Sequence, residues 1–229
     1  MKLSVIIPVH NEESTIEEVI RRVRAVDLGD IEREIVVVDD ASTDSTPGRL
    51  RAYADDPDML VLRHEVNRGK GRAIRTGIEH VSGELAIIQD ADLEYDPNDY
   101  PRLVAPILSG AADVVYGSRF RGRAENMAFP NWLANKILSW TATVLFGRRV
   151  TDEATCYKVF RTDVLRSFDL ACERFEFCPE VTARTLSRGL RLVEVPISYR
   201  ARTVEAGKKI RALDGLQAIW TLIRYRFRR

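Results

Sequence analysis

The sequence predicts an α/β fold in which a mostly parallel sheet is covered by helices on both faces. Three observations support this prediction. Short, mostly β-branched apolar runs recur along the first half of the chain. Segments with the 3.6-residue periodicity of helices separate these runs. The 229 residues are 45% hydrophobic and 30% charged, enough apolar material for one sizeable core. We therefore expect one domain over residues 1–229.

The first half of the chain contains five expected strands. They are the apolar runs Leu3–Val9, Ile35–Val38, Met59–Leu62, Leu85–Ile88 and Val114–Tyr116. The first expected helix lies between the first two runs, because apolar residues there recur on one helical face: Ile16, Val19, Ile20, Val23 and Val26. A second helix is expected after Gly71 and a third after Pro97. Strands and helices in alternation are typical of a parallel sheet, which places ligands beyond the carboxyl ends of its strands.

The second half is less regular, and we place the change near Gly122. This divides the domain into two parts, residues 1–121 and 122–229. The expected elements are helices over Met127–Phe146 and Pro179–Arg188, a strand over Val193–Tyr199 and a mixed segment over Thr151–Phe160. A polar loop over Ala201–Lys209, which we expect to be mobile, precedes an amphipathic helix over Ile210–Arg229.

Composition excludes several classes of protein. The three cysteines contain no C-x-x-C pair, so no disulfide framework is expected. A spanning helix needs about 20 uninterrupted apolar residues, and the most apolar stretch, Trp132–Phe146, contains Asn135 and Lys136. We therefore expect a soluble, cytoplasmic protein without a transmembrane segment.

The net charge of +1 conceals a strong asymmetry. Asp27–Asp58 holds ten acidic and three basic residues, whereas Arg200–Arg229 holds nine basic and two acidic ones. A basic end suits nucleic acid, anionic lipid or a phosphorylated substrate. No nucleic-acid-binding motif accompanies it, so nucleic acid is excluded as a partner.

Acidic side chains follow three of the expected strands at the point where each one ends. The strand ends read Pro8-Val9-His10-Asn11-Glu12, Asp39-Asp40-Ala41-Ser42-Thr43-Asp44 and Gln89-Asp90-Ala91-Asp92-Leu93-Glu94. Carboxylates that converge at one sheet edge need a cation, and their hard oxygens suit Mg²⁺ or Mn²⁺, which also hold substrate phosphates. For isolated acids such as Asp44 and Asp99, capping of the following turn is the stronger interpretation.

A glycine-rich segment, Asn67-Arg68-Gly69-Lys70-Gly71, precedes the second expected helix. Exposed backbone N–H groups and a cation at a helix start form an anion site, so we expect Lys70 to contact a bound anion. An ordinary glycine turn is the alternative interpretation. The segment is not a P-loop, because the G-x-x-x-x-G-K-[ST] pattern is absent.

These segments resemble the motifs of family-2 glycosyltransferases of the GT-A fold, a Rossmann-like fold for nucleoside-diphosphate sugars. The matching motifs are, in order, Val5–Glu12, Val37–Asp44, Asn67–Gly71 and Asp90–Asp92. The later motifs are similar to those of dolichol-phosphate mannosyltransferases and their bacterial polyprenyl-phosphate relatives: Gly117-Ser118-Arg119, Asp152-x-x-Thr155-Cys156-Tyr157-Lys158, Phe175-Glu176-Phe177 and Gly207-Lys208-Lys209. Two residues depart from the pattern, since Cys156 stands where many relatives carry Gly and Glu94 where they often carry Gln.

The resemblance implies that residues 1–121 form a nucleotide-sugar-binding half, in which Lys70 contacts the donor, and that residues 122–229 form an acceptor half. It also implies a role for each group of matching residues. The nucleotide base and ribose would be bound by Pro8, His10, Glu12 and Asp40. The metal, Mg²⁺ or Mn²⁺, would be held by Asp92 and Glu94, with Asp90 touching the metal shell or the donor. The diphosphate would be covered by Arg202, Lys208 and Lys209, and the acceptor phosphate would be bound by Ser118 and Arg119.

The sequence therefore predicts a metal-dependent, inverting glycosyltransferase. It would move a hexose from a nucleoside-diphosphate sugar, GDP-mannose or a UDP-sugar, to polyprenyl or dolichyl phosphate at the cytoplasmic membrane face. A phosphate acceptor is already anionic and needs cations, not a general base. One alternative is a soluble transferase that acts on a saccharide or protein hydroxyl, with Asp152 as base. Another is a non-catalytic nucleotide-sugar-binding module.

The expected contact with the membrane is peripheral and lies in the last helix. The helix over Met127–Phe146, followed by Arg148-Arg149, suits either a membrane interface or ordinary packing. Its apolar residues Ile219, Trp220 and Ile223 stand near a cluster of arginines at the end of the chain: Arg224, Arg226, Arg228 and Arg229. An apolar stripe rimmed with arginine is typical of a helix that lies among anionic lipid headgroups. The donor base and the oligomeric state stay open.

Overall fold

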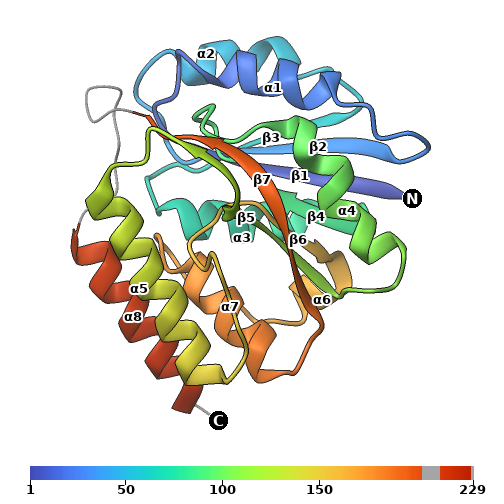
Figure 1. Cartoon of the computed structure of the whole chain (residues 1–229). Coiled ribbons are helices and arrows are strands. Elements are labelled where there is room, and N and C mark those ends of the chain that lie inside the picture. Colours follow the sequence, from blue (N-terminus) through green and yellow to red (C-terminus); the bar gives the residue numbers. More distant parts are fainter. Residues whose placement is uncertain (203–211, 228–229) are drawn as a thin grey trace.

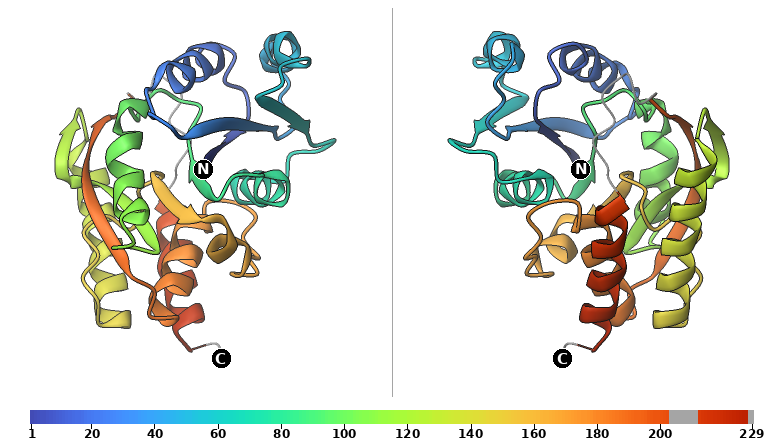
Figure 2. Two further views of the ribbon diagram at one scale, coloured as in Figure 1. Left: turned by 90° about the vertical axis from the view of Figure 1, so that its right-hand side faces the viewer. Right: turned by 90° about the vertical axis from the view of Figure 1, so that its left-hand side faces the viewer.

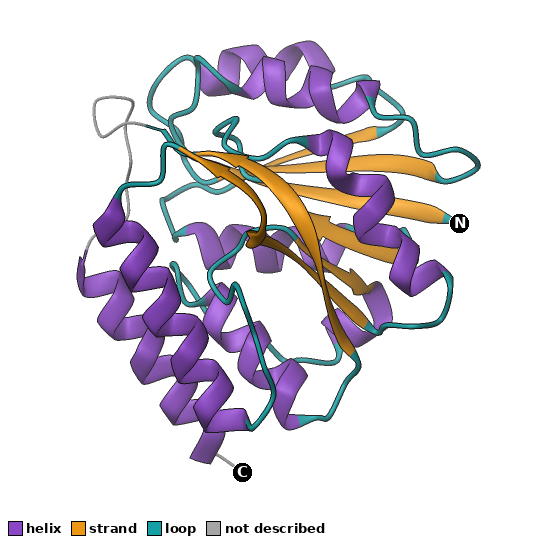
Figure 3. Cartoon of the chain, in the orientation of Figure 1, coloured by secondary structure: helices purple, strands orange, loops and turns teal. Residues whose placement is uncertain are grey.

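A seven-stranded, mostly parallel sheet organises the part of the chain that the computed structural model describes, residues 1–202 and 212–227 (Figures 1 and 3). The strands are β1 (Lys2–Val9), β2 (Glu32–Asp39), β3 (Met59–Arg63), β4 (Leu85–Ile88), β5 (Val114–Glu125), β6 (Lys158–Arg161) and β7 (Leu192–Arg200). Their order in the sheet is β3-β2-β1-β4-β6-β5-β7. The predicted fold class is therefore confirmed.

One strand runs against its neighbours. β6 pairs antiparallel with both β4 and β5, whereas β1 pairs in parallel with β2 and β4, and β5 with β7. The sequence did not reveal β6, because it has only four residues and begins with a lysine. Lys158 is nevertheless fully buried, and its ammonium donates to the carbonyls of Glu153 and Thr155 at 2.6 Å.

Helices cover both faces of the sheet. They are α1 (Ile16–Ala25), α2 (Thr46–Leu50), α3 (Lys70–His80), α4 (Tyr100–Leu108), α5 (Phe129–Phe146), α6 (Thr162–Arg166), α7 (Phe177–Ser187) and α8 (Ala212–Phe227), with short 3₁₀ turns at Arg51–Tyr53 and Pro97–Asp99. Figures 1 and 2 show α1 and α2 on one side of β1–β3 and α3 on the other. The apolar face predicted for α1 is buried, so burial of that stripe against the sheet fixes the helix.

Three helices form a separate layer beside the sheet. α5 and α8 lie side by side and both pack on α7 (Figures 1 and 2). Ala142, Ala183 and Leu222 form a small apolar cluster where these helices meet, apart from the main core. None of the described helices is long and apolar enough to cross a membrane.

β5 continues through the expected boundary at residues 121–122. Its register with β7 shifts between Ser118 and Arg123, which marks an irregularity in the pairing. Gly122 sits at this point, where an added Cβ would lie 2.1 Å from the carbonyl oxygen of Ile197. Only glycine fits so close an approach, and beyond it the strand leads the chain to α5.

Candidate active site

The carboxyl ends of β1, β2 and β4 open into one cavity of about 720 Å³. Ten of the predicted site residues line it: Pro8, His10, Glu12, Asp40, Lys70, Asp90, Asp92, Glu94, Arg119 and Arg202. Ser118 and Asp152 do not line it, and Lys208 and Lys209 lie outside the described residues, as does most of the predicted loop. Residues far apart in the sequence thus meet at the sheet edge where parallel strands place ligands.

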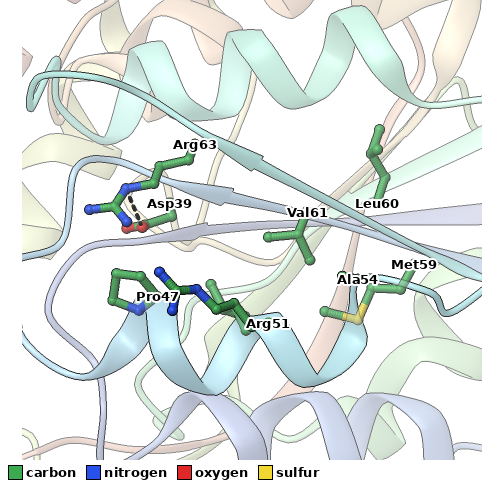
Figure 4. Close-up of a pocket in the computed structure, with 9 residues that line it drawn as sticks. Asp39, Pro47, Arg51, Ala54, Met59, Leu60, Val61 and Arg63 are labelled. Carbon is green, nitrogen blue, oxygen red and sulfur yellow. Dashed lines mark ion pairs between the residues drawn. The ribbon is translucent and has the colours of Figure 1, made fainter.

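A second, smaller pocket of about 290 Å³ lies between α2 and β3 (Figure 4). Asp39 forms an ion pair there with Arg63, at 3.4 Å between Oδ2 and Nε. The other carboxylate oxygen of Asp39 accepts the N–H of Ser42 at 2.9 Å, which holds the turn after β2. No predicted site residue lines this pocket, so we place the candidate site in the larger cavity.

Asp40 shapes the glycine-rich segment at the start of α3. Its carboxylate accepts the N–H groups of Arg68 and Gly69 at 2.8 and 2.7 Å, and Nδ1 of His64 lies 2.7 Å away. Gly69 has a φ of +92°, and an added Cβ there would lie 2.5 Å from the carbonyl oxygen of Glu173. Asp40 therefore fixes the anion-binding turn. His64 lies outside the motifs named in the sequence analysis, so this contact was not predicted.

Lys70 and Asp90 form an ion pair at the floor of the cavity. Burial alone would lower the pKa of Lys70, but the carboxylate of Asp90 outweighs it and raises this pKa well above its usual value. The ammonium is therefore charged at any physiological pH. A fixed positive charge here suits an anionic donor.

Asp92 and Glu94 are turned toward the same cavity by the residue between them. Leu93 has a φ of +61°, a left-handed conformation that is strained for a side chain of this size. The N–H of Glu94 donates to Asp92 Oδ1 at 3.1 Å. Glu94 accepts in turn from the hydroxyl of Tyr199 and the N–H of Arg202, both at 2.7 Å.

The acidic cluster carries more negative charge than its surroundings balance. Burial, and then the neighbouring carboxylates of Asp90 and Glu94, raise the pKa of Asp92 to about 7. No three acidic, histidine or cysteine side chains of the described chain are placed to enclose a metal by themselves. Mg²⁺ is usually bound by one or two carboxylates together with substrate phosphates. Asp92 and Glu94 fit that arrangement.

Arg119 is buried in the wall of the cavity and held by Asp152. Its Nε and Nη2 donate to the two carboxylate oxygens of Asp152 at 2.8 and 2.7 Å, and its backbone N–H donates at 2.9 Å. The guanidinium also lies 5.0 Å from the ring centre of Tyr199. This clamp fixes the orientation of the guanidinium.

Two predicted roles need correction. Asp152 is fully buried and both of its oxygens bind Arg119, so it is not placed to act as a general base. Ser118 is also fully buried, and its hydroxyl lies 2.7 Å from that of Thr151 and accepts the N–H of Arg121. The side chain of Ser118 is therefore not available to an acceptor phosphate.

The aromatic residues of the site were not predicted. Tyr95 and Tyr199 line the cavity, with ring centres 5.1 Å apart, and Tyr95 packs on Tyr157 at 4.6 Å. The hydroxyl of Tyr95 accepts the N–H of Cys156, which fixes the turn at that residue. Tyr95 directly follows the acidic triplet and Tyr199 ends a predicted strand, so their positions were the available signal.

The cavity extends from the acidic cluster to the helical layer. Its far wall comes from α5, α7 and α8 with their flanking turns and is mostly apolar: Met127, Pro130, Ala134, Leu138, Phe175, Phe177, Cys178, Pro179, Gly215 and Ala218, with the polar residues Asn131, Asn135, Arg174 and Asp214 among them. Arg119 lines the same cavity. One continuous space therefore offers carboxylates, the buried guanidinium of Arg119, the half-buried cations Lys70 and Arg202, and an apolar wall.

A family model confirms the class of protein that this fold and site define. The model for glycosyl transferase family 2 matches residues 4–168, and the chain belongs to this family. Solved structures agree on the fold. Glucosyl-3-phosphoglycerate synthase from Mycobacterium tuberculosis, in complex with phosphoglyceric acid, superposes with a TM-score of 0.75 at 23% identity, covering 98% of this chain and 79% of that one. The predicted GT-A fold is thereby confirmed.

Curated relatives show which members of the family this chain resembles in sequence. An undecaprenyl-phosphate mannosyltransferase of Micrococcus luteus is 33% identical over 223 residues, 91% of this chain and 87% of the relative. A dolichol-phosphate mannosyltransferase of Pyrococcus furiosus is 29% identical, covering 98% of this chain and 64% of the relative. An undecaprenyl-phosphate 4-deoxy-4-formamido-L-arabinose transferase of Enterobacter sp. is 33% identical, covering 88% and 60%. The chain thus spans less than two thirds of the length of the P. furiosus and Enterobacter relatives.

Proposed function

We propose that the chain is a metal-dependent glycosyltransferase that moves a hexose from a nucleoside-diphosphate sugar to polyprenyl phosphate at the cytoplasmic membrane face. The observation that carries the proposal is the continuous cavity. Carboxylates and cations line one end of it, an apolar wall lines the other, and Arg119 lines the same cavity. The first end suits a nucleoside diphosphate with a divalent ion, and the second suits an isoprenoid chain. Relatives whose names specify polyprenyl-phosphate acceptors support this proposal.

The donor would lie along the carboxyl ends of the strands. Its base and ribose would contact the β1 and β2 ends, namely Pro8, His10, Glu12 and Asp40, which line the cavity. Lys70 would face the diphosphate, together with Arg202 and with Lys208 or Lys209. Asp92 and Glu94 would hold Mg²⁺ or Mn²⁺, which stabilises the charge that develops on the leaving diphosphate. A M. tuberculosis neighbour of the same fold was solved with Mn²⁺ and UDP, which supports the metal.

The acceptor phosphate would be positioned by Arg119. An oxygen of the phosphate monoester attacks C1 of the sugar, and the bond from C1 to the diphosphate breaks with its electron pair on the leaving group. Attack from the opposite side inverts the configuration at C1. The step needs no general base, because the attacking oxygen is already anionic. The burial of Asp152 counts against the hydroxyl-acceptor alternative, which needs that base.

An exposed apolar surface on α5 and α8 would contact the membrane. Its side chains, between 40% and 74% exposed, are Phe129, Trp132, Leu133, Ile137, Trp140, Val144, Leu216, Trp220 and Phe227. Exposed arginines accompany it, namely Arg148, Arg149, Arg224 and Arg226. Of the apolar residues predicted for this contact, Trp220 is exposed and Ile219 and Ile223 are half-buried, and the predicted Arg228 and Arg229 lie outside the described residues. Large exposed apolar patches mark interaction surfaces, and arginine at the rim favours anionic headgroups.

Replacing both Trp140 and Trp220 with glutamine is expected to release the protein from anionic liposomes. The two side chains are 67% and 62% exposed, so burying each in the headgroup layer contributes about 2 kcal/mol or less. Sedimentation with liposomes measures the change. Leu60→Gln, at a side chain 40% exposed on the edge strand β3, is the matched control and should bind normally. Unchanged binding of the double variant would remove this surface from the membrane contact.

The proposed activity is tested with a panel of GDP- and UDP-sugars and a short polyprenyl phosphate. We expect transfer from one donor, dependent on Mn²⁺ or Mg²⁺ and abolished by EDTA, with a glycosyl phosphodiester as product. The free alcohol of the same lipid should accept nothing, because only the phosphate supplies an anionic nucleophile. Transfer to the alcohol or to a saccharide instead would favour the hydroxyl-acceptor alternative, and donor binding without turnover would favour the binding module.

A further inference from the structure

The guanidinium of Arg202 contacts the acidic cluster, which consists of Asp90, Asp92 and Glu94. Its Nη2 donates to Asp92 Oδ2 at 3.0 Å and its Nη1 to Glu12 Oε2 at 3.2 Å. Asp92 and Glu12 come from the ends of different strands, β4 and β1. One arginine thus ties together two carboxylates that line the donor end of the cavity.

The main chain that carries Arg202 is anchored independently of this side chain. The N–H of Arg202 donates to Glu94 Oε1 at 2.7 Å, and the N–H of Arg200 donates to the carbonyl of Glu94 at 2.8 Å. The Tyr199 hydroxyl also donates to Glu94, and Tyr95 and Tyr199 form an isolated bridge. The guanidinium can therefore leave Asp92 by side-chain rotation while residues 199–202 keep their place.

The carboxylates do not satisfy every donor of the Arg202 guanidinium. Nε of Arg202 is buried without a hydrogen-bond partner among the residues that the structure describes. Lys70 pairs with Asp90, and Arg202 bridges Asp92 and Glu12. A divalent ion would bring two positive charges to Asp92 where the guanidinium brings one.

We propose that Arg202 is an internal counter-ion that competes with the divalent ion for Asp92 and leaves it when a nucleoside diphosphate enters. The proposal rests on the proposed function and deepens it. The diphosphate oxygens accept both a forked guanidinium and a metal, so the donor gives Arg202 a new partner as the ion takes Asp92. The metal alone then binds weakly, and metal and nucleotide strengthen each other.

The test measures Mn²⁺ binding directly, from the electron paramagnetic resonance signal of the free ion, with Mn²⁺ as the only added ligand. We expect Arg202→Gln to bind Mn²⁺ about tenfold more tightly than the unmodified chain, the factor that about 1.4 kcal/mol of lost competition produces. Arg200→Gln is the matched control, because it removes the same charge two residues earlier in the chain. The side chain of Arg200 is 75% exposed and pairs with Glu125. Its Mn²⁺ affinity should be unchanged.

A second arm adds UDP or GDP. In the unmodified chain the nucleotide should strengthen Mn²⁺ binding by a larger factor than in Arg202→Gln, since the variant has no counter-ion to displace. Arg202→Lys keeps the charge without the fork and should lie between the two. Thermal unfolding by circular dichroism checks that each variant is folded.

The outcomes separate the inference from the proposed function. If Arg202→Gln binds Mn²⁺ no more tightly than the unmodified chain and shows the same nucleotide effect, Arg202 is not a competing counter-ion. If instead no form binds Mn²⁺ even with a nucleoside diphosphate, the metal-dependent function itself is wrong. An equal gain in Arg200→Gln would reduce the effect to general charge and would also overturn the inference.

Discussion

Replacing Asp92 with asparagine is expected to reduce sugar transfer by at least about 100-fold, the loss seen when one electrostatic stabiliser of a transition state is removed. Asp92 lines the donor end of the cavity and retains carboxylate lone pairs for a metal beside its bonds to Glu94 and Arg202. Asparagine keeps the shape and removes the charge. Initial rates with saturating Mn²⁺ measure the effect, and Asp163→Asn, at a side chain 70% exposed, is the charge-matched control.

The same substitution should stabilise the metal-free protein at neutral and higher pH. The folded protein raises the pKa of Asp92 from 3.8 to about 7, so it holds this proton more tightly than the unfolded chain does. Stability linked to Asp92 is therefore fully present below pH 4 and is lost as the pH rises toward 7. Thermal unfolding in EDTA should show Asp92→Asn more stable than the unmodified chain at pH 8 and similar to it at pH 4. The opposite order at pH 8 would contradict the charge imbalance.

Arg119→Gln is expected to lower transfer to polyprenyl phosphate by at least about 100-fold, because the cation that positions the acceptor phosphate is lost. It should also lower the free energy of unfolding by about 3–5 kcal/mol, since Asp152 is left buried without its charged partner. Nucleoside diphosphate affinity should be almost unchanged, because Arg119 is assigned to the acceptor. Initial rates, urea unfolding and nucleotide titration measure the three effects.

The double variant Arg119→Met with Asp152→Asn separates the two roles of this pair. Its asparagine oxygen still accepts the backbone N–H of Arg119 that Asp152 now accepts, and this pair no longer holds a buried charge. Stability should return to near that of the unmodified chain, while transfer stays lost. Recovery of transfer in the double variant would show that Arg119 contributes only to folding.

The sequence by itself determined the alternation of elements, the family and the residues at the donor end of the cavity, since most of the predicted site residues line it. These features are local: apolar runs of three to seven residues predict the parallel strands, and the residues just after each run must lie at the ligand edge of the sheet. His10, Asp40, Asp90 and Asp92 are placed by this rule alone. Short motifs, each within a few residues of an apolar run, were therefore enough to predict these positions.

Only the tertiary structure decided which of these groups meet and which are accessible. Arg202 contacts Glu12 across 190 positions of sequence, and Asp152 is enclosed behind Arg119 and removed from the cavity. The antiparallel strand β6 was hidden because its lysine is buried on backbone carbonyls. α5 is apolar on most sides, so its periodicity could not tell which side chains pack and which stay exposed. Burial and partners depend on elements that are distant in the chain, and no short-range pattern records them.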